Sequence, residues 1–396
     1  MRATAVRDYR CCRLGDSDLK PRSTAEACRL RWAPRNPLTV PAGENAAEIL
    51  SVGRALPPHY ADQETLIFAF RDGWREQHYN LERLEELHRA VQVSGRYLSL
   101  PIGEYAKLDS FAKRNEAWGR VAVQLGESAI RSALQAAQLT PREVDALFFV
   151  TVTGVATPSL DAALANRLGL RADVKRTPIF GLGCAAGAAG TARAADYLRA
   201  FPNQLAVLLS VELCSLTLQR EDLSIANIIA SGLFGDGAAA VVLGGGQRGP
   251  SRGPRVIATR SVFYPNTERI MGWDLVDGGF KVVLSAKVPQ VVTENIRRDV
   301  DSFLAEHGLV RSRIAHWIAH TGGPKVLKAF EAALELPPAA LDRSWRSLSE
   351  TGNLSSASVL FVLADLLEAR AAKPGDYAVL LAMGPGFCSE LVLLQW

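Results

Sequence analysis

A cysteine stands at a predicted strand-to-helix turn near the middle of the chain. Cys184 follows Gly181-Leu-Gly183 and opens a stretch rich in alanine and glycine that runs to Ala195 and predicts a helix. The start of a helix carries a partial positive charge and free N–H groups, and both favour a thiolate. Because the thiolate is the nucleophilic form of cysteine, Cys184 is a candidate nucleophile. The same pattern also suits a buried structural cysteine.

Two polar residues in the second half of the chain could complete a site with this cysteine. His320 ends an apolar run and precedes a Thr-Gly-Gly-Pro turn, which places a side chain at the carboxyl end of a strand. Asn353 lies in the segment 350–356, where it could equally cap a helix. Together, a thiolate could take an acyl group. The His and Asn donors could stabilise the oxygen that becomes negative when a malonyl thioester loses carbon dioxide.

The elements that must position these residues alternate between strands and helices, which indicates an α/β fold. Helices are predicted over Glu64–Val91 and Glu116–Ala137. Short apolar runs predict buried strands at Glu48–Val52, Ala146–Val152, Leu205–Val211, Ala238–Leu243, Trp317–Ala319, Tyr377–Ala382 and Leu391–Leu394.

An internal duplication relates the two halves of the chain. Gly183-Cys184 is followed twelve residues later by Asp196, and Gly352-Asn353 is followed twelve residues later by Asp365. The runs 144–151 and 205–209 are matched, in the same order, by the runs 314–321 and 377–381. We therefore expect a pseudo-two-fold core in which Cys184 and Asn353 occupy equivalent places, with His320 ending a strand of the second half.

Several motifs resemble those of the chalcone and stilbene synthase superfamily, the type III polyketide synthases. They are Gly181–Gly187, Leu233-Phe-Gly-Asp-Gly237, His320–Pro324, Gly352–Ser356 and Gly384-Pro-Gly-Phe387. The resemblance covers about residues 48–396 and implies a five-layered αβαβα thiolase fold built from two duplicated halves, and a homodimer. We expect a flexible extension over residues 1–48, a half with the nucleophile over 49–250, and a half with His and Asn over 251–396.

The resemblance also assigns roles to individual residues. It implies a catalytic triad of Cys184, His320 and Asn353, with Phe234 gating the tunnel from the coenzyme A side. Substrate-binding positions matched in this way are Cys214, Thr217, Thr157, Trp273, Gly384, Pro385, Gly386 and Phe387, of which Thr157 is expected to cross into the partner's cavity. Basic residues in the region that binds coenzyme A are Arg83, Arg89 and Lys325.

The implied reaction loads an acyl-CoA starter and extends it with malonyl-CoA by decarboxylative Claisen condensation, followed by cyclisation. A small Cys214 and a bulky Trp273 make the pattern most similar to bacterial alkylresorcinol and alkylpyrone synthases, so a fatty acyl starter is the first expectation. A synthase that starts from malonyl-CoA and makes a naphthalene, and a single-round β-ketoacyl synthase, are the alternatives. A thioester hydrolase would need no Asn353, and a non-catalytic scaffold would need none of the three residues.

The composition of the chain argues against several other classes of protein. The chain has 396 residues, 48% of them hydrophobic, and a net charge of +4, which argues against a protein that wraps nucleic acid. No apolar run reaches the roughly 18–20 residues of a membrane span, and no signal peptide precedes the fold, so we expect a cytoplasmic protein. The spacing of Cys11, Cys12 and Cys28 fits no common zinc site. We expect no metal and no cofactor, with coenzyme A thioesters as substrates.

Overall fold

The structure is a computed structural model that describes residues 45–74, 80–249 and 253–396. These residues belong to one compact unit, Pro41–Trp396. The expected extension over residues 1–48 lies outside the described residues up to residue 44, as do Cys11, Cys12 and Cys28. In the described part of the chain, none of the helices combines the length and the apolar character that crossing a membrane demands.

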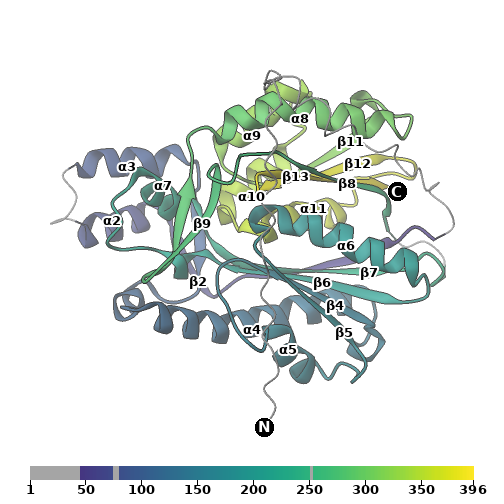
Figure 1. Cartoon of the computed structure of the whole chain (residues 1–396), viewed down its shortest axis with the longest axis horizontal. Coiled ribbons are helices and arrows are strands. Elements are labelled where there is room, and N and C mark those ends of the chain that lie inside the picture. Colours follow the sequence, from purple (N-terminus) through teal and green to yellow (C-terminus); the bar gives the residue numbers. More distant parts are fainter. Residues whose placement is uncertain (1–44, 75–79, 250–252) are drawn as a thin grey trace, which may run out of the picture. The chain divides into compact units, whose positions relative to one another are not determined.

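Strands and helices alternate along the chain as predicted (Figure 1). The strands are β1 Glu48–Ala55, β2 His59–Asp62, β3 Gly95–Leu98, β4 Ala146–Thr151, β5 Lys175–Phe180, β6 Leu205–Leu213, β7 Asp236–Gly244, β8 Arg255–Phe263, β9 Met271–Val276, β10 Gly279–Leu284, β11 Ile314–Ala319, β12 Tyr377–Gly384 and β13 Cys388–Gln395. The helices are α2 Gln63–Gly73, α3 Leu81–Ala90, α4 Phe111–Ala136, α5 Leu160–Leu168, α6 Ala186–Ala200, α7 Ile225–Leu233, α8 Val288–Ala305, α9 Pro324–Leu334, α10 Asp342–Thr351 and α11 Ser358–Glu368.

The strand pairing repeats between the two halves. In the first half β4 runs parallel to β6, and β6, β7 and β1 then pair antiparallel. In the second half β11 runs parallel to β12, and β12, β13 and β8 then pair antiparallel. Strand β5 adds to the edge of the first set, and the two sets meet only where Glu48 pairs with Arg255. The duplication read from the sequence is thus confirmed in the topology.

Helices form three layers around the two sets of strands, as Figure 1 shows. Helices α4 and α5 cover the outer face of the first set, α8 and α9 cover the second, and α6 and α11 lie between them. Close packing explains the small residues of α6, since a Cβ on Gly187 would lie 2.2 Å from the carbonyl oxygen of Ser356. A Cβ on Gly190 would lie 2.5 Å from Leu208. The predicted αβαβα thiolase fold is confirmed.

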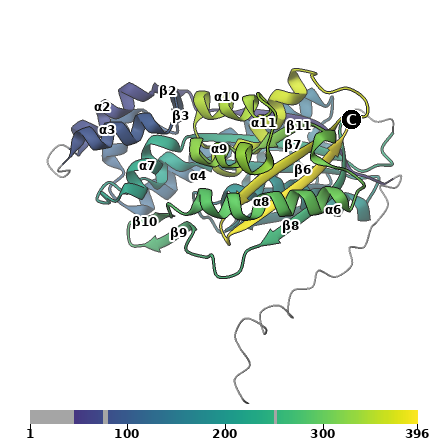
Figure 2. The same ribbon diagram turned by 90° about the horizontal axis from the view of Figure 1, so that it is seen from above.

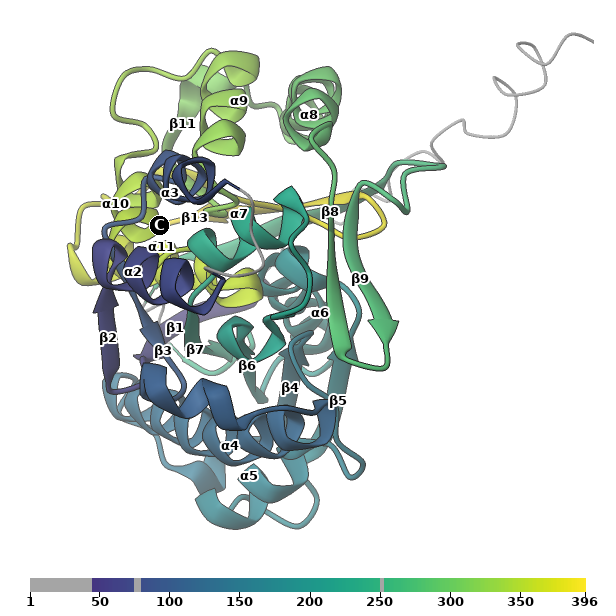
Figure 3. The same ribbon diagram turned by 90° about the vertical axis from the view of Figure 1, so that its left-hand side faces the viewer.

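The region before α4 departs from the sequence prediction. Instead of one helix over Glu64–Val91, the chain forms α2 and α3, each begun by its own capping side chain. Asp62 accepts from the N–H of Thr65 at 2.7 Å, and Asn80 accepts from the N–H of Arg83 at 2.9 Å. The leucines on which the prediction rested, Leu81, Leu84 and Leu87, all lie on α3. Their periodicity therefore did not show that a separate helix precedes them. Helices α2, α3 and α7 gather at one end of the strands (Figures 2 and 3).

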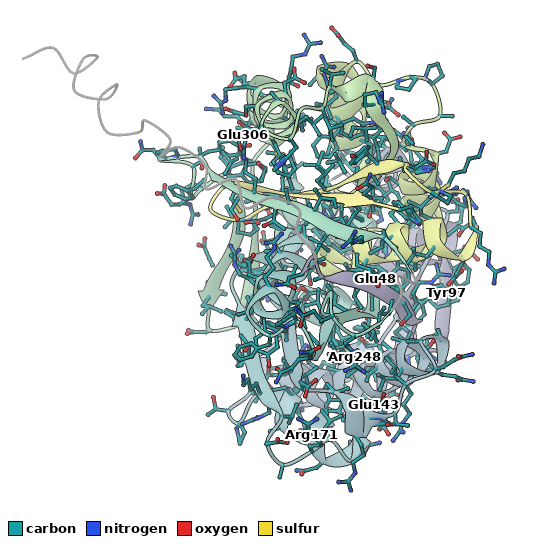
Figure 4. All side chains as sticks on the ribbon, turned by 90° about the vertical axis from the view of Figure 1, so that its right-hand side faces the viewer. Glu48, Tyr97, Glu143, Arg171, Arg248 and Glu306 are labelled. Atoms are coloured by element: carbon teal, nitrogen blue, oxygen red, sulfur yellow. The ribbon has the colours of Figure 1, made fainter. Side chains whose placement is uncertain are left out.

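Many charged side chains lie at the surface in ion pairs, and members of three of these pairs are labelled in Figure 4. On the first half Arg171 pairs with Asp145 at 2.9 Å, and Arg248 lies 3.7 Å from Glu143. On the second half Glu306 pairs with Arg260. Ion pairs of this kind contribute little stability each, because water screens them. The folding free energy therefore comes mainly from the apolar layers between helices and strands.

Candidate active site

The Cys184 turn lies directly after β5. Gly181 and Gly183 take positive φ angles of 95° and 50°, and a short 3-10 turn over Gly183–Ala185 leads into α6. A Cβ on Gly183 would lie 2.6 Å from Pro385, and one on Gly384 would lie 2.6 Å from the backbone nitrogen of Ala185. The Gly384-Pro385 pair therefore packs against the turn that presents the thiol, and glycine is required on both sides of this contact.

Asn353 is held by its backbone and by one end of its side chain. Its N–H donates to the carbonyl of Leu233 at 2.9 Å, and its carbonyl accepts from Gly235 at 3.0 Å. Its Oδ1 accepts from the N–H of Ser355 at 2.8 Å and from the hydroxyl of Ser358 at 3.4 Å. The Cys184 sulfur lies 3.7 Å from the hydroxyl of Ser355, two residues after Asn353, and a hydrogen bond with the Asn353 side chain lowers the pKa of the thiol. The structure thus brings Cys184 and Asn353 together.

His320 follows the last residue of β11 and is only 3% exposed. Its N–H donates to Leu381 of β12 at 2.9 Å, three residues before Gly384 of the Cys184 contact. A Cβ on Gly323, in the turn after His320, would lie 3.5 Å from Leu233, whose carbonyl holds Asn353. The imidazole Nδ1 has no hydrogen-bond partner among the described residues. His320 is therefore buried next to the backbone segments that support Cys184 and Asn353, and its Nδ1 is not used in a hydrogen bond.

Burial dominates the electrostatics of this site. It raises the pKa of Cys184 to about 12, with the charge of Glu212 adding to the increase, while hydrogen bonds from Ser355 and Asn353 lower it. Burial also lowers the pKa of His320 to about 3. Desolvation therefore opposes the thiolate that the helix start favours. A thiolate forms when the thiol proton passes to a partner that stabilises the new charges.

Sequence reasoning missed a buried carboxylate beside the thiol. Glu212 of β6 is fully buried and accepts from the N–H of Val152 at 3.1 Å, the hydroxyl of Thr153 at 3.0 Å, and the hydroxyl of Ser356. Burial raises its pKa to about 7. A single acidic residue inside the otherwise apolar run of β6 was the signal available in the sequence.

A cavity of about 190 Å³ opens beside the site. Its wall includes Cys214, Thr217, Phe234 and Trp273, as the sequence predicted. Phe234 follows α7 and forms a parallel bridge with Asn353, which places the predicted gate directly beside the predicted catalytic amide. The wall is mixed in character: α2 contributes apolar side chains, whereas Arg96, Tyr105, Ser215, Asn227 and Ser231 are polar.

The comparisons with known proteins agree with this arrangement. The model of the N-terminal domain of chalcone and stilbene synthases matches residues 39–247, and the model of the C-terminal domain matches residues 255–396. The chain belongs to this family. Its bacterial relatives make it a type III polyketide synthase, a transferase that catalyses decarboxylative condensation of malonyl-CoA.

Two named relatives of this synthase are informative. It is 52% identical over 356 residues to a 1,3,6,8-tetrahydroxynaphthalene synthase of Streptomyces peucetius subsp. caesius, covering 89% of this chain and 94% of the relative. The solved structure of a 1,3,6,8-tetrahydroxynaphthalene synthase from Streptomyces coelicolor A3(2) matches with a TM-score of 0.84 and 31% identity, over 88% of this chain and 99% of that one. A synthase from the brown alga Ectocarpus siliculosus matches with a TM-score of 0.82 and 27% identity.

Some predicted site residues of the synthase lie away from the cavity. Thr157 is exposed in the loop after β4, so it does not enter the cavity of its own subunit. Phe387 is buried against Tyr264 of the second core, with ring centroids 6.2 Å apart, and is not among the cavity-lining residues. Pro385 and Gly386 share this loop, and only Gly384 and Pro385 contact the Cys184 turn.

The three basic residues predicted to bind coenzyme A lie on two different helices, α3 and α9. Arg83 pairs with Glu86 at 2.8 Å, and Arg89 is held by Glu64 at 2.9 Å and Glu85 at 3.2 Å. Carboxylates therefore already occupy both guanidinium groups, which weakens their case as phosphate ligands. Lys325 is exposed in the first turn of α9. Within the described ranges, no group of three His, Cys, Asp or Glu side chains could hold a metal ion.

A buried polar cap at the end of α7 supports the gate and was also missed. Arg96 donates to the carbonyls of Ser231 and Gly232. Gln63 donates to the carbonyl of Gly232 at 3.1 Å, and His88 contacts the carbonyl of Ile228 at 3.0 Å. The last carbonyls of a helix lack partners within the helix, so these side chains satisfy them. The cap fixes the backbone that continues into Phe234.

Proposed function

We propose that this type III polyketide synthase uses malonyl-CoA as both starter and extender and makes a tetrahydroxynaphthalene. The observation that carries the proposal is the 52% identity to a 1,3,6,8-tetrahydroxynaphthalene synthase over nearly the whole of both chains. A second relative with that name, from Streptomyces coelicolor, is 33% identical over 346 residues. These relatives favour the malonyl starter over the fatty starter that was the first expectation from the sequence.

The wall of the cavity supports the same choice. Tyr105, Ser215 and Asn227 bring hydroxyl and amide groups to it. These groups already hydrogen-bond within the protein: Tyr105 to Ser215, Ser215 to Asp236, and Asn227 to the carbonyls of Gln219 and Asp222. Hydroxyl and amide oxygens can accept more than one hydrogen bond. The enol hydroxyls of a poly-β-keto chain could donate to them, whereas a hydrocarbon chain could make no hydrogen bond there.

The triad accounts for the chemistry as follows. The Cys184 thiol gives its proton to His320 and attacks the thioester carbonyl of malonyl-CoA, and the departing coenzyme A thiolate takes that proton. A second malonyl-CoA then loses carbon dioxide, and N–H donors of His320 and Asn353 stabilise the enolate oxygen. The enolate carbon attacks the Cys184 thioester and expels the thiolate, and the lengthened chain, now a coenzyme A thioester, is loaded on Cys184 again for the next round. A naphthalene has ten ring carbons, so the product would need five two-carbon units, with the carboxyl of the starter also lost as carbon dioxide, and no further cofactor.

The starter choice gives a direct prediction. Purified enzyme supplied with malonyl-CoA alone should release coenzyme A and form tetrahydroxynaphthalene, detected by mass spectrometry. Hexanoyl- or decanoyl-CoA added at equal concentration should be incorporated at least tenfold less efficiently, because an alkyl chain cannot make hydrogen bonds to the side chains of the cavity wall. The Trp273→Gly variant should accept hexanoyl-CoA better than the wild type, since it removes a large ring from the cavity wall. A kcat/KM that rises with alkyl chain length in the wild type would contradict the proposal.

We further propose that the synthase is a homodimer, with coenzyme A thioesters as its other partners and a cytoplasmic location. Strand β5 is the edge of the nine-stranded sheet among the described strands, and most of its side chains are exposed. Phe180 at its end is 53% exposed, and Val155, two residues before Thr157, is 41% exposed. An exposed edge strand with neighbouring apolar side chains is a ready surface for pairing with another chain.

The dimer can be tested at this edge. Phe180→Asp should shift the mass measured by analytical ultracentrifugation at micromolar concentration from dimer toward monomer, because it places a charge in the interface. Val310→Asp, a change at an equally exposed valine of the second half (61% exposed), should leave the mass unchanged. A wild-type protein that sediments as a monomer would contradict the dimer.

A further inference from the structure

A chain of three hydrogen-bonded side chains reaches the cavity wall at a point separate from the triad. Asp236, the first residue of β7, is fully buried. It accepts from the N–H of Ser215 at 2.7 Å and from the Ser215 hydroxyl. The Ser215 hydroxyl lies 2.6 Å from the phenolic oxygen of Tyr105. Tyr105 and Ser215 both line the cavity, together with Cys214 and Trp273.

The direction of these hydrogen bonds follows from the groups present. Asp236 also accepts from the N–H and the hydroxyl of Ser99, both at 2.6 Å, so its oxygens serve as acceptors throughout. Since the one hydroxyl proton of Ser215 points to Asp236, the Ser215 oxygen must accept the proton of Tyr105. The phenolic oxygen then has its proton committed inward. The N–H groups of Leu100, at 3.4 Å, and of Ser99 also lie near this oxygen, but the Ser99 N–H donates to Asp236 at 2.6 Å, so a lone pair of the phenolic oxygen can still accept a hydrogen bond.

We propose that Tyr105 is a specificity-determining residue whose phenolic oxygen accepts a hydrogen bond from an enol hydroxyl of the poly-β-keto chain and so fixes how that chain folds before cyclisation. The proposal rests on the proposed function of the cavity. A keto oxygen has no proton to give and would face the lone pair of another acceptor. An enol hydroxyl at the same place donates one. The site therefore selects the enol tautomer at one position along the chain.

Selection of an enol matters because its carbon is the nucleophile in ring closure. In a carbon–carbon cyclisation of the aldol kind, the enol carbon forms the new bond to a carbonyl carbon, whose C=O π bond opens, and the enol proton passes to that carbonyl oxygen as the enol becomes a ketone. Without a fixed enol, an enol oxygen can instead attack the thioester carbonyl and expel the Cys184 thiolate, which gives a lactone, a pyrone. The ratio of aromatic to pyrone products thus reports on the hydrogen bond of Tyr105.

The burial of Tyr105 agrees with this assignment. Burial raises the pKa of the phenol, with the charge of Asp236 adding to the increase, so the proton stays on the oxygen and the inward hydrogen bond is kept. Hydrogen bonds in a chain polarise one another, which makes an oxygen whose own proton is donated toward a carboxylate a better acceptor.

The test compares Tyr105→Phe, Ser215→Ala and the control Tyr97→Phe. Tyr97 lies on β3, packs against Tyr60 at 5.1 Å, and does not line this cavity. Each purified full-length variant is given malonyl-CoA, and coenzyme A release, the aromatic-to-pyrone ratio and the melting temperature are measured. Tyr105→Phe should lower the ratio roughly tenfold, and the ratio is compared at equal amounts of coenzyme A released, so that a change in the rate of condensation is measured separately. Tyr97→Phe should match the wild type.

Ser215→Ala separates a hydrogen-bonding role from a packing role. It keeps the ring of Tyr105 but removes the acceptor of its proton, so the phenol can turn that proton toward the chain and lose its preference for the enol. The ratio should fall here too, whereas a ring that acts only by its bulk would leave it unchanged. If Tyr105→Phe fails to fold, Ser215→Ala decides alone. An unchanged ratio in the folded variants would overturn the proposal.

The same measurements distinguish this proposal from the proposed function. A wild type that makes no naphthalene from malonyl-CoA would refute the proposed product. The role of Tyr105 would still be judged by the ratio of carbon-closed rings to lactones among the products formed from the accepted starter. An unchanged ratio in both cavity variants would refute the role of Tyr105 even if the naphthalene is made.

Discussion

Replacing Cys184 by alanine should abolish condensation, with product below about one thousandth of the wild-type rate. The acyl chain has no other attachment point at this turn, and alanine fits because the site already packs tightly around a small side chain. The measurement is product formation by mass spectrometry, together with acyl-enzyme formation after incubation with malonyl-CoA. Losing the nucleophile of a triad removes most of the rate enhancement of such enzymes.

Cys388→Ala is the matched control for this variant. Cys388 is also a buried free cysteine, with its sulfur 3.5 Å from the carbonyl of Pro385, but it lies at the start of β13 rather than at a helix start. It should still become acylated at Cys184. Full-length product from Cys184→Ala, or an acyl group found on Cys388 in the wild type, would refute the assignment.

Asn353→Ala should separate decarboxylation from acylation. The oxygen of the Asn353 side chain accepts from the N–H of Ser355, so its amide nitrogen remains as a donor for an enolate oxygen near Cys184. Removing one such donor typically costs about 3 kcal/mol, roughly a hundred- to thousandfold in kcat. Malonyl-CoA decarboxylation should fall by this amount, whereas acylation of Cys184 should change by less than about tenfold.

Asn353→Asp tests the competing structural role. Aspartate keeps the oxygen that accepts from the N–H of Ser355 and is as good a helix cap as asparagine. It lacks the N–H donors and places a negative charge beside the enolate. We expect it to lose decarboxylation as fully as alanine does, with a lower melting temperature than the wild type because the new carboxylate is buried. Decarboxylation that survives in Asn353→Asp would show that the cap is the role of this residue.

The features of the site that depend on the position of a residue along the backbone could be predicted from the sequence. Cys184 and Asn353 start equivalent turns of duplicated halves, and the buried strands were visible as apolar runs, so both the fold and the pairing of these residues were predictable. Trp273 and Phe234 were placed by motif and do line the cavity. These features follow from local pattern and from the order of the elements.

Features that depend on burial could not be read in this way. His88 has the spacing of an amphipathic helix, and its full burial against α7 arises only from contacts between distant segments. The burial of Cys184 could not be read from the sequence either, because the helix start is a local feature whereas the desolvation that raises the pKa of the thiol is set by the whole fold. Arg83 and Arg89 have the charge that phosphates require, but acidic neighbours from α2 and α3 engage them.

The pairing of Leu233–Gly235 with Asn353 limits how this scaffold can diversify. One stretch of backbone carries both the entrance side chain Phe234 and the two hydrogen bonds that hold the decarboxylating amide. Changes to the backbone around Phe234 that widen the entrance for larger thioesters would therefore also shift Asn353. By contrast, Trp273 lies on the hairpin of β9 and β10, which forms a separate two-stranded sheet. Substitutions on that hairpin can change the shape of the cavity without moving the predicted catalytic residues.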